Sequence, residues 1–90
     1  MIVTVARVSD LDRFMEVFEG IGAEKRREHR CRSARVYLDP DDEHRVWSVF
    51  DWDPADYEGF LADPGIPEIA RALGLEGAPV HVDAATELDA

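Results

Sequence analysis

The sequence predicts a single α+β domain with the element order β-α-β-β-α-β. The chain has 90 residues, a length typical of one domain. Hydrophobic residues make up 46% of it, which is too many for general disorder. These residues alternate in some segments, as in strands, and recur at intervals of three and four in others, as in helices.

The first residues indicate a strand followed by a helix. Ile2–Val8 is β-branched and apolar on both alternating faces, which favours a strand. Ser9 or Asp10 then offers an N-cap for a helix. An apolar stripe at helical spacing follows, formed by Leu11, Phe14, Met15, Phe18, Ile21 and Gly22.

Two glycines interrupt this helical pattern. Gly20 and Gly22 each weaken a helix by about 1 kcal/mol relative to alanine, so we expect a kink or an early end. If the helix continues, Lys25 and His29 extend its apolar stripe.

Two further strands are predicted to form a hairpin. The apolar runs are Arg32–Leu38 and Arg45–Trp52. Between them, Asp39–His44 combines a proline with clustered aspartates, which favours a turn.

The last third of the chain predicts two short helices and a strand. Asp53 offers an N-cap with a proline at the first helical position, and the inward side chains are Tyr57, Phe60 and Leu61. Ile66–Leu73 allows a second short helix, and Pro79–Leu88 is the fourth predicted strand.

This order is that of the ferredoxin-like fold, an antiparallel four-stranded sheet with helices on one face. Water normally covers the other face, which is then polar. In the third predicted strand, however, Trp47 and Val49 lie opposite a second apolar set comprising Val46, Phe50 and Trp52 together with Ser48. We therefore expect a homodimer in which two sheets pack face to face.

The charge balance limits the classes of partner. The chain has 20 acidic and 10 basic residues, a formal net charge of −10. Such a surface repels phosphate backbones and anionic lipids, so we expect neither nucleic acid nor a membrane as a partner. The single cysteine, Cys31, allows no internal disulfide, and the N-terminus lacks the pattern of a signal peptide. These features predict a cytoplasmic protein.

Short segments over nearly the whole chain resemble a known family. They are SDLDRF at 9–14, VF at 17–18, ARVY at 34–37, DPDDE at 39–43, VFDWD at 49–53 and FLADP at 60–64. With the Val-rich first strand, they resemble the dimeric α/β-barrel superfamily, and most closely its antibiotic-biosynthesis-monooxygenase branch. The resemblance implies a barrel-forming dimer with a pocket between each sheet and its helices.

The resemblance also implies a range of activities. Some members of this branch oxidise polycyclic aromatic molecules with O2 and without metal or flavin, and relatives degrade haem, isomerise lactones or bind amino acids. The oxygenases and the haem-degrading members use a constellation of Asn, Trp and His. The chain contains no Asn, so that constellation is incomplete here. No cofactor is predicted.

Candidate catalytic residues are His81 and Asp83 on the last predicted strand. They are two residues apart, so their side chains share one face. A carboxylate beside an imidazole stabilises the imidazolium, which allows His81 to act as a general base near neutral pH. The alternative is an exposed polar face of a terminal strand.

His29 is a second candidate base, because it extends the apolar stripe toward the expected pocket. With Lys25 it would hold an anionic group such as a carboxylate or an enolate. The alternative is a histidine at a helix C-terminus, where its cationic form suits the helix dipole. A basic cluster in the same region has two alternative roles: capture of an acidic ligand, or ion pairs with Glu24 and Glu28. It consists of Lys25, Arg26, Arg27, Arg30, Arg32 and Arg35.

Aromatic residues predict a pocket for a small aromatic ligand, with walls that include Trp47, Trp52, Tyr57 and Phe18. In a domain of this size, the core and a dimer interface would also use such residues. No metal site is predicted, because the three histidines are far apart and no HxxxH, HxH or CxxC spacing occurs.

Three functions remain open on this evidence. The first is cofactor-independent oxidation or isomerisation of a small aromatic or polyketide-like molecule, with His81 or His29 as the base. The second is a noncatalytic ligand-binding or stress-associated module, and the third is a structural dimer without a pocket. A histidine with a perturbed pKa inside a pocket would favour an enzyme, whereas a wholly apolar lining would favour binding without catalysis.

Overall fold

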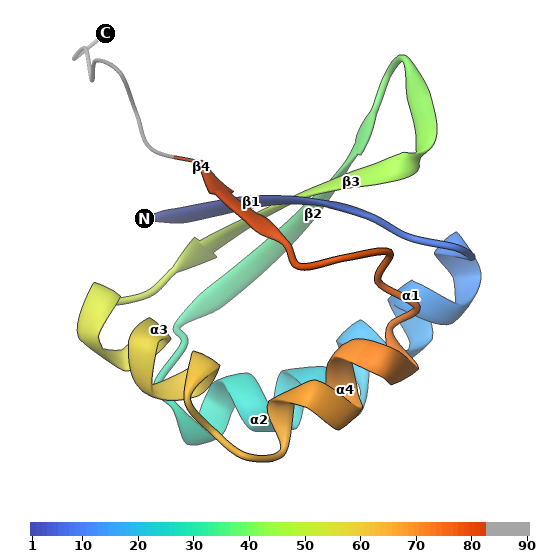
Figure 1. The fold of residues 1–90 in the computed structure, drawn as a ribbon. Coiled ribbons are helices and arrows are strands. Elements are labelled where there is room, and N and C mark those ends of the chain that lie inside the picture. The colour runs from blue at the N-terminus through green and yellow to red at the C-terminus, as the bar shows by residue number, and fades with distance from the viewer. Residues whose placement is uncertain (83–90) are drawn as a thin grey trace, which may run out of the picture.

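The computed structural model describes residues 1–82. Within that range the elements follow the order β1 (Ile2–Arg7), α1 (Leu11–Glu19), α2 (Ile21–Glu28), β2 (Ser33–Asp39), β3 (Asp42–Asp51), α3 (Pro54–Leu61), α4 (Ile66–Ala72) and β4 (Val80–Val82). The strands form one sheet in the order β2-β3-β1-β4, and each neighbouring pair is antiparallel. The helices lie on one face of this sheet (Figure 1). The predicted ferredoxin-like arrangement is therefore confirmed.

The first predicted helix divides into two at a glycine. Asp10 is the N-cap of α1, since its Oδ1 accepts a hydrogen bond from the backbone N–H of Arg13 at 3.0 Å. Gly20 separates α1 from α2, so the expected interruption of the helix is confirmed. A Cβ at Gly22 would lie 3.0 Å from the carbonyl oxygen of Val17, so any larger residue would force the turn between the two helices to shift.

The hairpin between β2 and β3 is tighter than predicted. The prediction of a turn over Asp39–His44 is wrong in its length, because only Pro40 and Asp41 lie between the strands. Asp39 pairs with Asp42 across the ladder, and Oδ1 of Asp39 accepts from the backbone N–H of Asp41 at 2.9 Å. This local bond gives the backbone N–H of Asp41 a partner within the turn, so β2 can continue to Asp39 and β3 can begin at Asp42.

The end of the described chain forms one edge of the sheet. β4 pairs with β1, whereas residues 83–88 of the predicted last strand lie outside the described range. Of the helices in residues 1–82, none has the length and hydropathy needed to cross a membrane.

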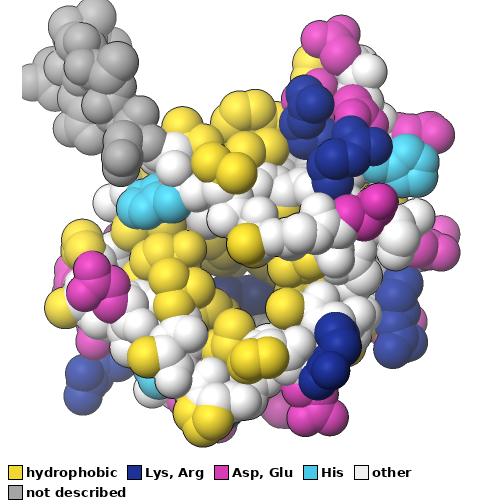
Figure 2. All heavy atoms as spheres, in the orientation of Figure 1, with side chains coloured by type: hydrophobic (Ala, Val, Ile, Leu, Met, Phe, Trp, Pro, Cys, Tyr) yellow, Lys and Arg dark blue, Asp and Glu magenta, His cyan; other side chains and the backbone are white. Residues whose placement is uncertain are grey.

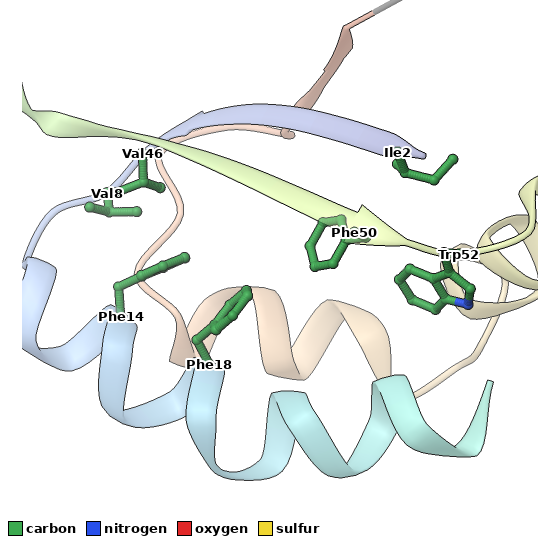
Figure 3. Packing of buried hydrophobic residues seen from close by; sticks show 7 residues of the cluster. All are labelled: Ile2, Val8, Phe14, Phe18, Val46, Phe50 and Trp52. Atoms are coloured by element: carbon green, nitrogen blue, oxygen red, sulfur yellow. The ribbon is translucent and has the colours of Figure 1, made fainter. Parts of the chain in front are cut away.

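Side chains on the helix-facing side of the sheet form the core. The buried residues of β3 and its C-terminal end are Val46, Ser48, Phe50 and Trp52. They face Phe14 and Phe18, which rise from α1 toward the sheet (Figure 3). Nε1 of Trp52 donates to the backbone carbonyl of His29 at 2.8 Å and so ties the end of β3 to the end of α2.

The other face of the sheet is also apolar, and no helix of the described chain covers it (Figure 1). On this face the ladder places Val49 beside Val3 and Trp47 beside Val5. Val80 of β4 lies opposite Val5 and is 60% exposed. A continuous apolar surface therefore lies on the side of the sheet that faces away from the helices.

Candidate functional site

A cavity of about 140 Å³ lies between the sheet and the helices. Strands β1 and β3 form its floor, and α1 to α4, with the segment that leads to β4, form its walls. Figure 2 shows a hollow that hydrophobic side chains surround. A concave, predominantly apolar lining is typical of binding sites for small organic molecules.

Six of the described lining residues are aromatic. They are Phe14, Phe18, Phe50, Trp52, Tyr57 and Phe60. The ring centroid of Phe18 lies 5.3 Å from that of Phe14 and 6.2 Å from that of Phe50. Trp52 lies 5.3 Å from Tyr57 and 4.8 Å from Phe60. Rings at these separations attract one another, so the wall is stabilised by its own contacts.

A few polar residues of the described chain also face the cavity. Thr4 and Ser48 lie opposite each other in the β1–β3 ladder and are buried on the cavity side. Arg26 of α2 is the one charged residue among the described residues that line it. Figure 2 shows a basic side chain deep in the hollow. Such polar groups in an apolar site orient a ligand.

Arg26 is held against the aromatic wall. Its Nη2 donates to the backbone carbonyl of Phe18 at 3.1 Å, and its Cζ lies 3.9 Å from the centroid of the Phe18 ring. Burial lowers the pKa of this guanidinium from its usual value, although an arginine remains charged in proteins. A positive charge therefore lies at the border of an apolar cavity.

Three of the predicted pocket residues, Phe18, Trp52 and Tyr57, line this cavity. Trp47 does not, and its assignment to the pocket is corrected. Because side chains alternate along β3, Trp47 and Trp52 point to opposite faces of the sheet. Trp47 lies on the open face, where its Nε1 donates to Oδ2 of Asp39 at 3.0 Å.

His29 lies at the C-terminal end of α2, outside the cavity lining. Its Nε2 is 2.9 Å from Oδ2 of Asp63, which also lies 3.3 Å from Nζ of Lys25. Nζ of Lys25 is in turn 2.9 Å from Oε2 of Glu28. The His29 ring packs edge-on against Phe60, with centroids 5.9 Å apart. This cluster ties α2 to the loop between α3 and α4, and so holds two walls of the cavity together.

The same cluster gathers three side chains of the types that bind metals. The ligand atoms of Glu28, His29 and Asp63 all lie within 4.8 Å of one another. The ammonium group of Lys25 contacts both carboxylates and offsets one of their two negative charges. In the described chain these residues form an ion-pair network.

Hydrogen bonds determine the ionisation of this cluster. The bond with His29 and the bond from the backbone N–H of Gly65 hold the pKa of Asp63 at about 2. An ionised carboxylate can only accept, so Nε2 of His29 must be the donor. The bond to Glu28, with a further contribution from Asp63, raises the pKa of Lys25.

His81 lies in a second hollow beside the cavity, which is also lined by Met1, Ile2, Pro54, Tyr57, Glu58 and Leu61. Its ring is edge-on to Tyr57, with centroids 5.8 Å apart. Tyr57 and Leu61 line both hollows, so these two side chains lie between His81 and the cavity. Asp83, its expected partner, lies outside the described residues.

Two residues of the site were not placed there from the sequence. Arg26 belongs to the basic cluster for which capture of an acidic ligand and ion pairs with Glu24 and Glu28 were the alternatives. A spacing of four residues across α1 and α2 joins it to the cavity wall, through Phe14, Phe18 and Gly22. Asp63 has no comparable local signal, because its partner His29 is 34 residues away in the chain.

Solved structures share this fold. A conserved protein from Methanosarcina mazei Go1 has a TM-score of 0.67 at 17% identity, over 90% of this chain and 85% of that chain. A proposed antibiotic biosynthesis monooxygenase from Deinococcus radiodurans has a TM-score of 0.66 at 15% identity, over 100% of this chain and 98% of that chain. Another proposed antibiotic biosynthesis monooxygenase, from Chloroflexus aurantiacus J-10-fl, has a TM-score of 0.58 at 15% identity, over 98% and 94%.

These likenesses confirm, at the level of the fold, the resemblance to the antibiotic-biosynthesis-monooxygenase branch. No family model matches the chain, and no curated protein does. The function is therefore argued from the cavity itself.

We expect Asp63→Asn to destabilise the protein near neutral pH and to do so much less in acid. The pKa of Asp63 is about 2 in the folded protein against 3.8 for an unperturbed group. A lowered pKa means that the carboxylate stabilises the fold above about pH 4, and that this contribution is lost as the pH falls toward 2. Asparagine keeps an oxygen for the Gly65 N–H but removes the charge. Urea unfolding at about pH 6 and pH 2.5 measures the difference.

The matched control is Asp41→Asn, at an exposed position in the turn between β2 and β3. Its free energy of unfolding should follow that of the wild type at both pH values. If Asp63→Asn lowers the free energy of unfolding equally at both pH values, the charge of Asp63 does not stabilise the fold.

Proposed function

We propose that this protein binds a small aromatic molecule in the cavity between its sheet and its helices. The observation that supports this best is the aromatic lining around about 140 Å³ of space. An engineered apolar cavity of about 150 Å³ admits benzene, so the volume suits a ligand with one aromatic ring. Edge-to-face and stacked contacts with the wall would add to the burial of such a ring.

Binding without catalysis is the function that this lining supports best. A general base must come within about 3 Å of the proton that it abstracts, or reach it through one water. Neither His29 nor His81 is among the described residues that line the cavity. The apolar lining therefore favours recognition over proton transfer.

Ala70→Leu should remove most of this binding. Ala70 of α4 lines the cavity, so the larger side chain would occupy space that the ligand needs. Leucine is also a good helix former, so α4 should persist. We expect the affinity for benzamide, a neutral ligand with one ring, to fall by roughly tenfold or more in an NMR titration.

Ala55→Leu is the matched control, at an exposed position of α3. This variant and the wild type should bind benzamide equally. If Ala70→Leu binds as well as they do, the ligand does not occupy this cavity.

We also propose a homodimer in which the open faces of two sheets pack together. In support, Val3, Val5, Trp47 and Val49 form an apolar surface that no helix of the described chain covers. Contiguous apolar patches of this kind are typical of protein interfaces. A two-fold axis lets the same patch of a second copy cover it, and the cavity on the other side of each sheet stays accessible.

Val49→Arg should convert this dimer into a monomer. Val49 lies between Val3 and Arg35 on the open face, so the new charge would enter an apolar interface beside another arginine. Native mass spectrometry should give a dimer for the wild type and a monomer for the variant. Ala55→Arg adds the same charge at an exposed helix position and should remain dimeric. A monomeric wild type would refute the dimer.

A second candidate function is cofactor-independent oxidation or isomerisation at the rim of the cavity. It is favoured by the contact between His81 and Tyr57, the ring that lines both hollows. His81, with Asp83, would take a proton from a phenol or an enol, and the resulting anion carries part of its negative charge on carbon. That carbon would either be reprotonated, which is isomerisation, or add O2 to form a peroxide. The peroxide would take the proton back from His81 and lose water, which leaves a carbonyl group. The names of two structures with the same fold motivate the oxidative form.

In this second case His81→Ala should lower O2 consumption with a panel of phenols and naphthols by roughly 100-fold, the usual contribution of a general base. His29→Ala should have a smaller effect, because Nε2 of His29 is already bonded to Asp63. His44→Ala is the control, since that ring bonds to the backbone of Val8. Unchanged turnover in His81→Ala would remove His81 from the mechanism.

A further inference from the structure

We propose that the ligand of the cavity is an organic anion, in which one aromatic ring fills the apolar space and a carboxylate or phenolate oxygen binds Arg26. This inference rests on the proposed binding function and names the chemical class of its ligand. Arg26 would recognise the anionic group, and the hydroxyls of Thr4 and Ser48 on the floor would be further donors.

Arg26 is partly buried and has no ion-pair partner in the described chain, whereas four other arginines have one. Aspartates pair with the surface residues Arg7, Arg30, Arg32 and Arg45. Among the described residues, no carboxylate pairs with Arg26, although the chain has 20 acidic residues to 10 basic ones. A charge that is partly removed from water gains more from a counter-charge than an exposed one does. An anionic ligand would provide that counter-charge.

The contacts of Arg26 leave most of its donors available to a ligand. A guanidinium has five N–H donors in a planar fork. In the described chain, Nη2 donates to the Phe18 carbonyl, and the Phe18 and Phe50 ring centroids lie 3.9 Å and 5.9 Å from Cζ. The stacking fixes the group against the cavity wall, so a ligand would meet donors that are already oriented.

Gly22 keeps space beside the guanidinium. It lines the same cavity one helical turn before Arg26. A Cβ at this position would lie 3.4 Å from Nη1 of Arg26, so a larger residue would crowd the group. The glycine thus leaves both the arginine and the space in front of it unobstructed.

The surroundings of Arg26 favour an anionic ligand over a neutral one. Hydrogen bonds between charged partners are roughly twice as strong as neutral ones, and apolar walls that exclude water strengthen them further. Arg26 and Arg27 in the last turn of α2 also offset, locally, the repulsion of an anion by a protein of net charge −10. A neutral ligand of the same shape would leave Arg26 without a partner and should bind less tightly.

Benzoate and benzamide test the inference, because they differ in charge while their shapes are nearly the same. In NMR titrations we expect the wild type to bind benzoate roughly tenfold to hundredfold more tightly than benzamide. The Nε–H signal of Arg26 should shift with benzoate and much less with benzamide.

Substitutions of Arg26 should remove this preference. Arg26→Met keeps an unbranched apolar side chain beside Phe18 but lacks the charge, so its affinity ratio should fall to about one. Arg26→Lys keeps the charge without the planar fork and should retain part of the preference. Arg27→Met is the matched control, since this exposed neighbour loses the same charge and should keep the full ratio.

Equal binding of the two ligands by the wild type, or a ratio unchanged in Arg26→Met, would overturn the anion inference and leave a neutral aromatic site in place. Binding of neither ligand at millimolar concentration would overturn the proposed function as well. If Arg26→Met does not fold, the Nε–H signal of Arg26 in the wild type decides. If that signal does not shift when benzoate is bound, the inference is overturned.

Discussion

The alternation of side chains along β3 determines both surfaces to which a function is assigned. Val46, Ser48 and Phe50 face the helices and line the cavity, whereas Trp47 and Val49 face the open side. A slip of one residue in the ladder would exchange these two sets. The pairing of β3 with β1 on one side and β2 on the other fixes the register. The cavity and the proposed dimer interface therefore depend on the same strand pairing.

The sequence predicted those parts of the fold that have local signals. The period-two runs indicated the strands, the N-cap at Asp10 indicated the start of α1, and Gly20 indicated the interruption after it. The position of the hairpin was predicted correctly, but the predicted turn is longer than the observed one. Asp39 and Asp42 have low strand propensity, and it is the hydrogen bond within the turn that lets the ladder reach them. The aspartates and the proline indicate a turn, but they do not indicate how far each strand continues into it.

The site was predictable in its composition and less so in its geometry. Phe18, Trp52 and Tyr57 line the cavity because large aromatic residues in a small domain are drawn to its interior. Trp47 was placed with them on residue type alone, although its odd separation from Trp52 along the strand puts it on the other face. The contact of His29 with Asp63 depends on how α2 meets the loop after α3, which no spacing in the chain encodes.

An open cavity lowers the stability of a small domain, which bears on why this one retains it. Its apolar lining is partly open to solvent, and each Å² of apolar surface left in contact with water forgoes roughly 25 cal/mol of stabilisation. Small domains are stable by only about 5–15 kcal/mol, so such a loss matters. A ligand that binds the folded state alone shifts the folding equilibrium in favour of that state. Filling the cavity with protein side chains would stabilise the fold and remove the proposed binding site together, so stability and the proposed function make opposite demands on the same space.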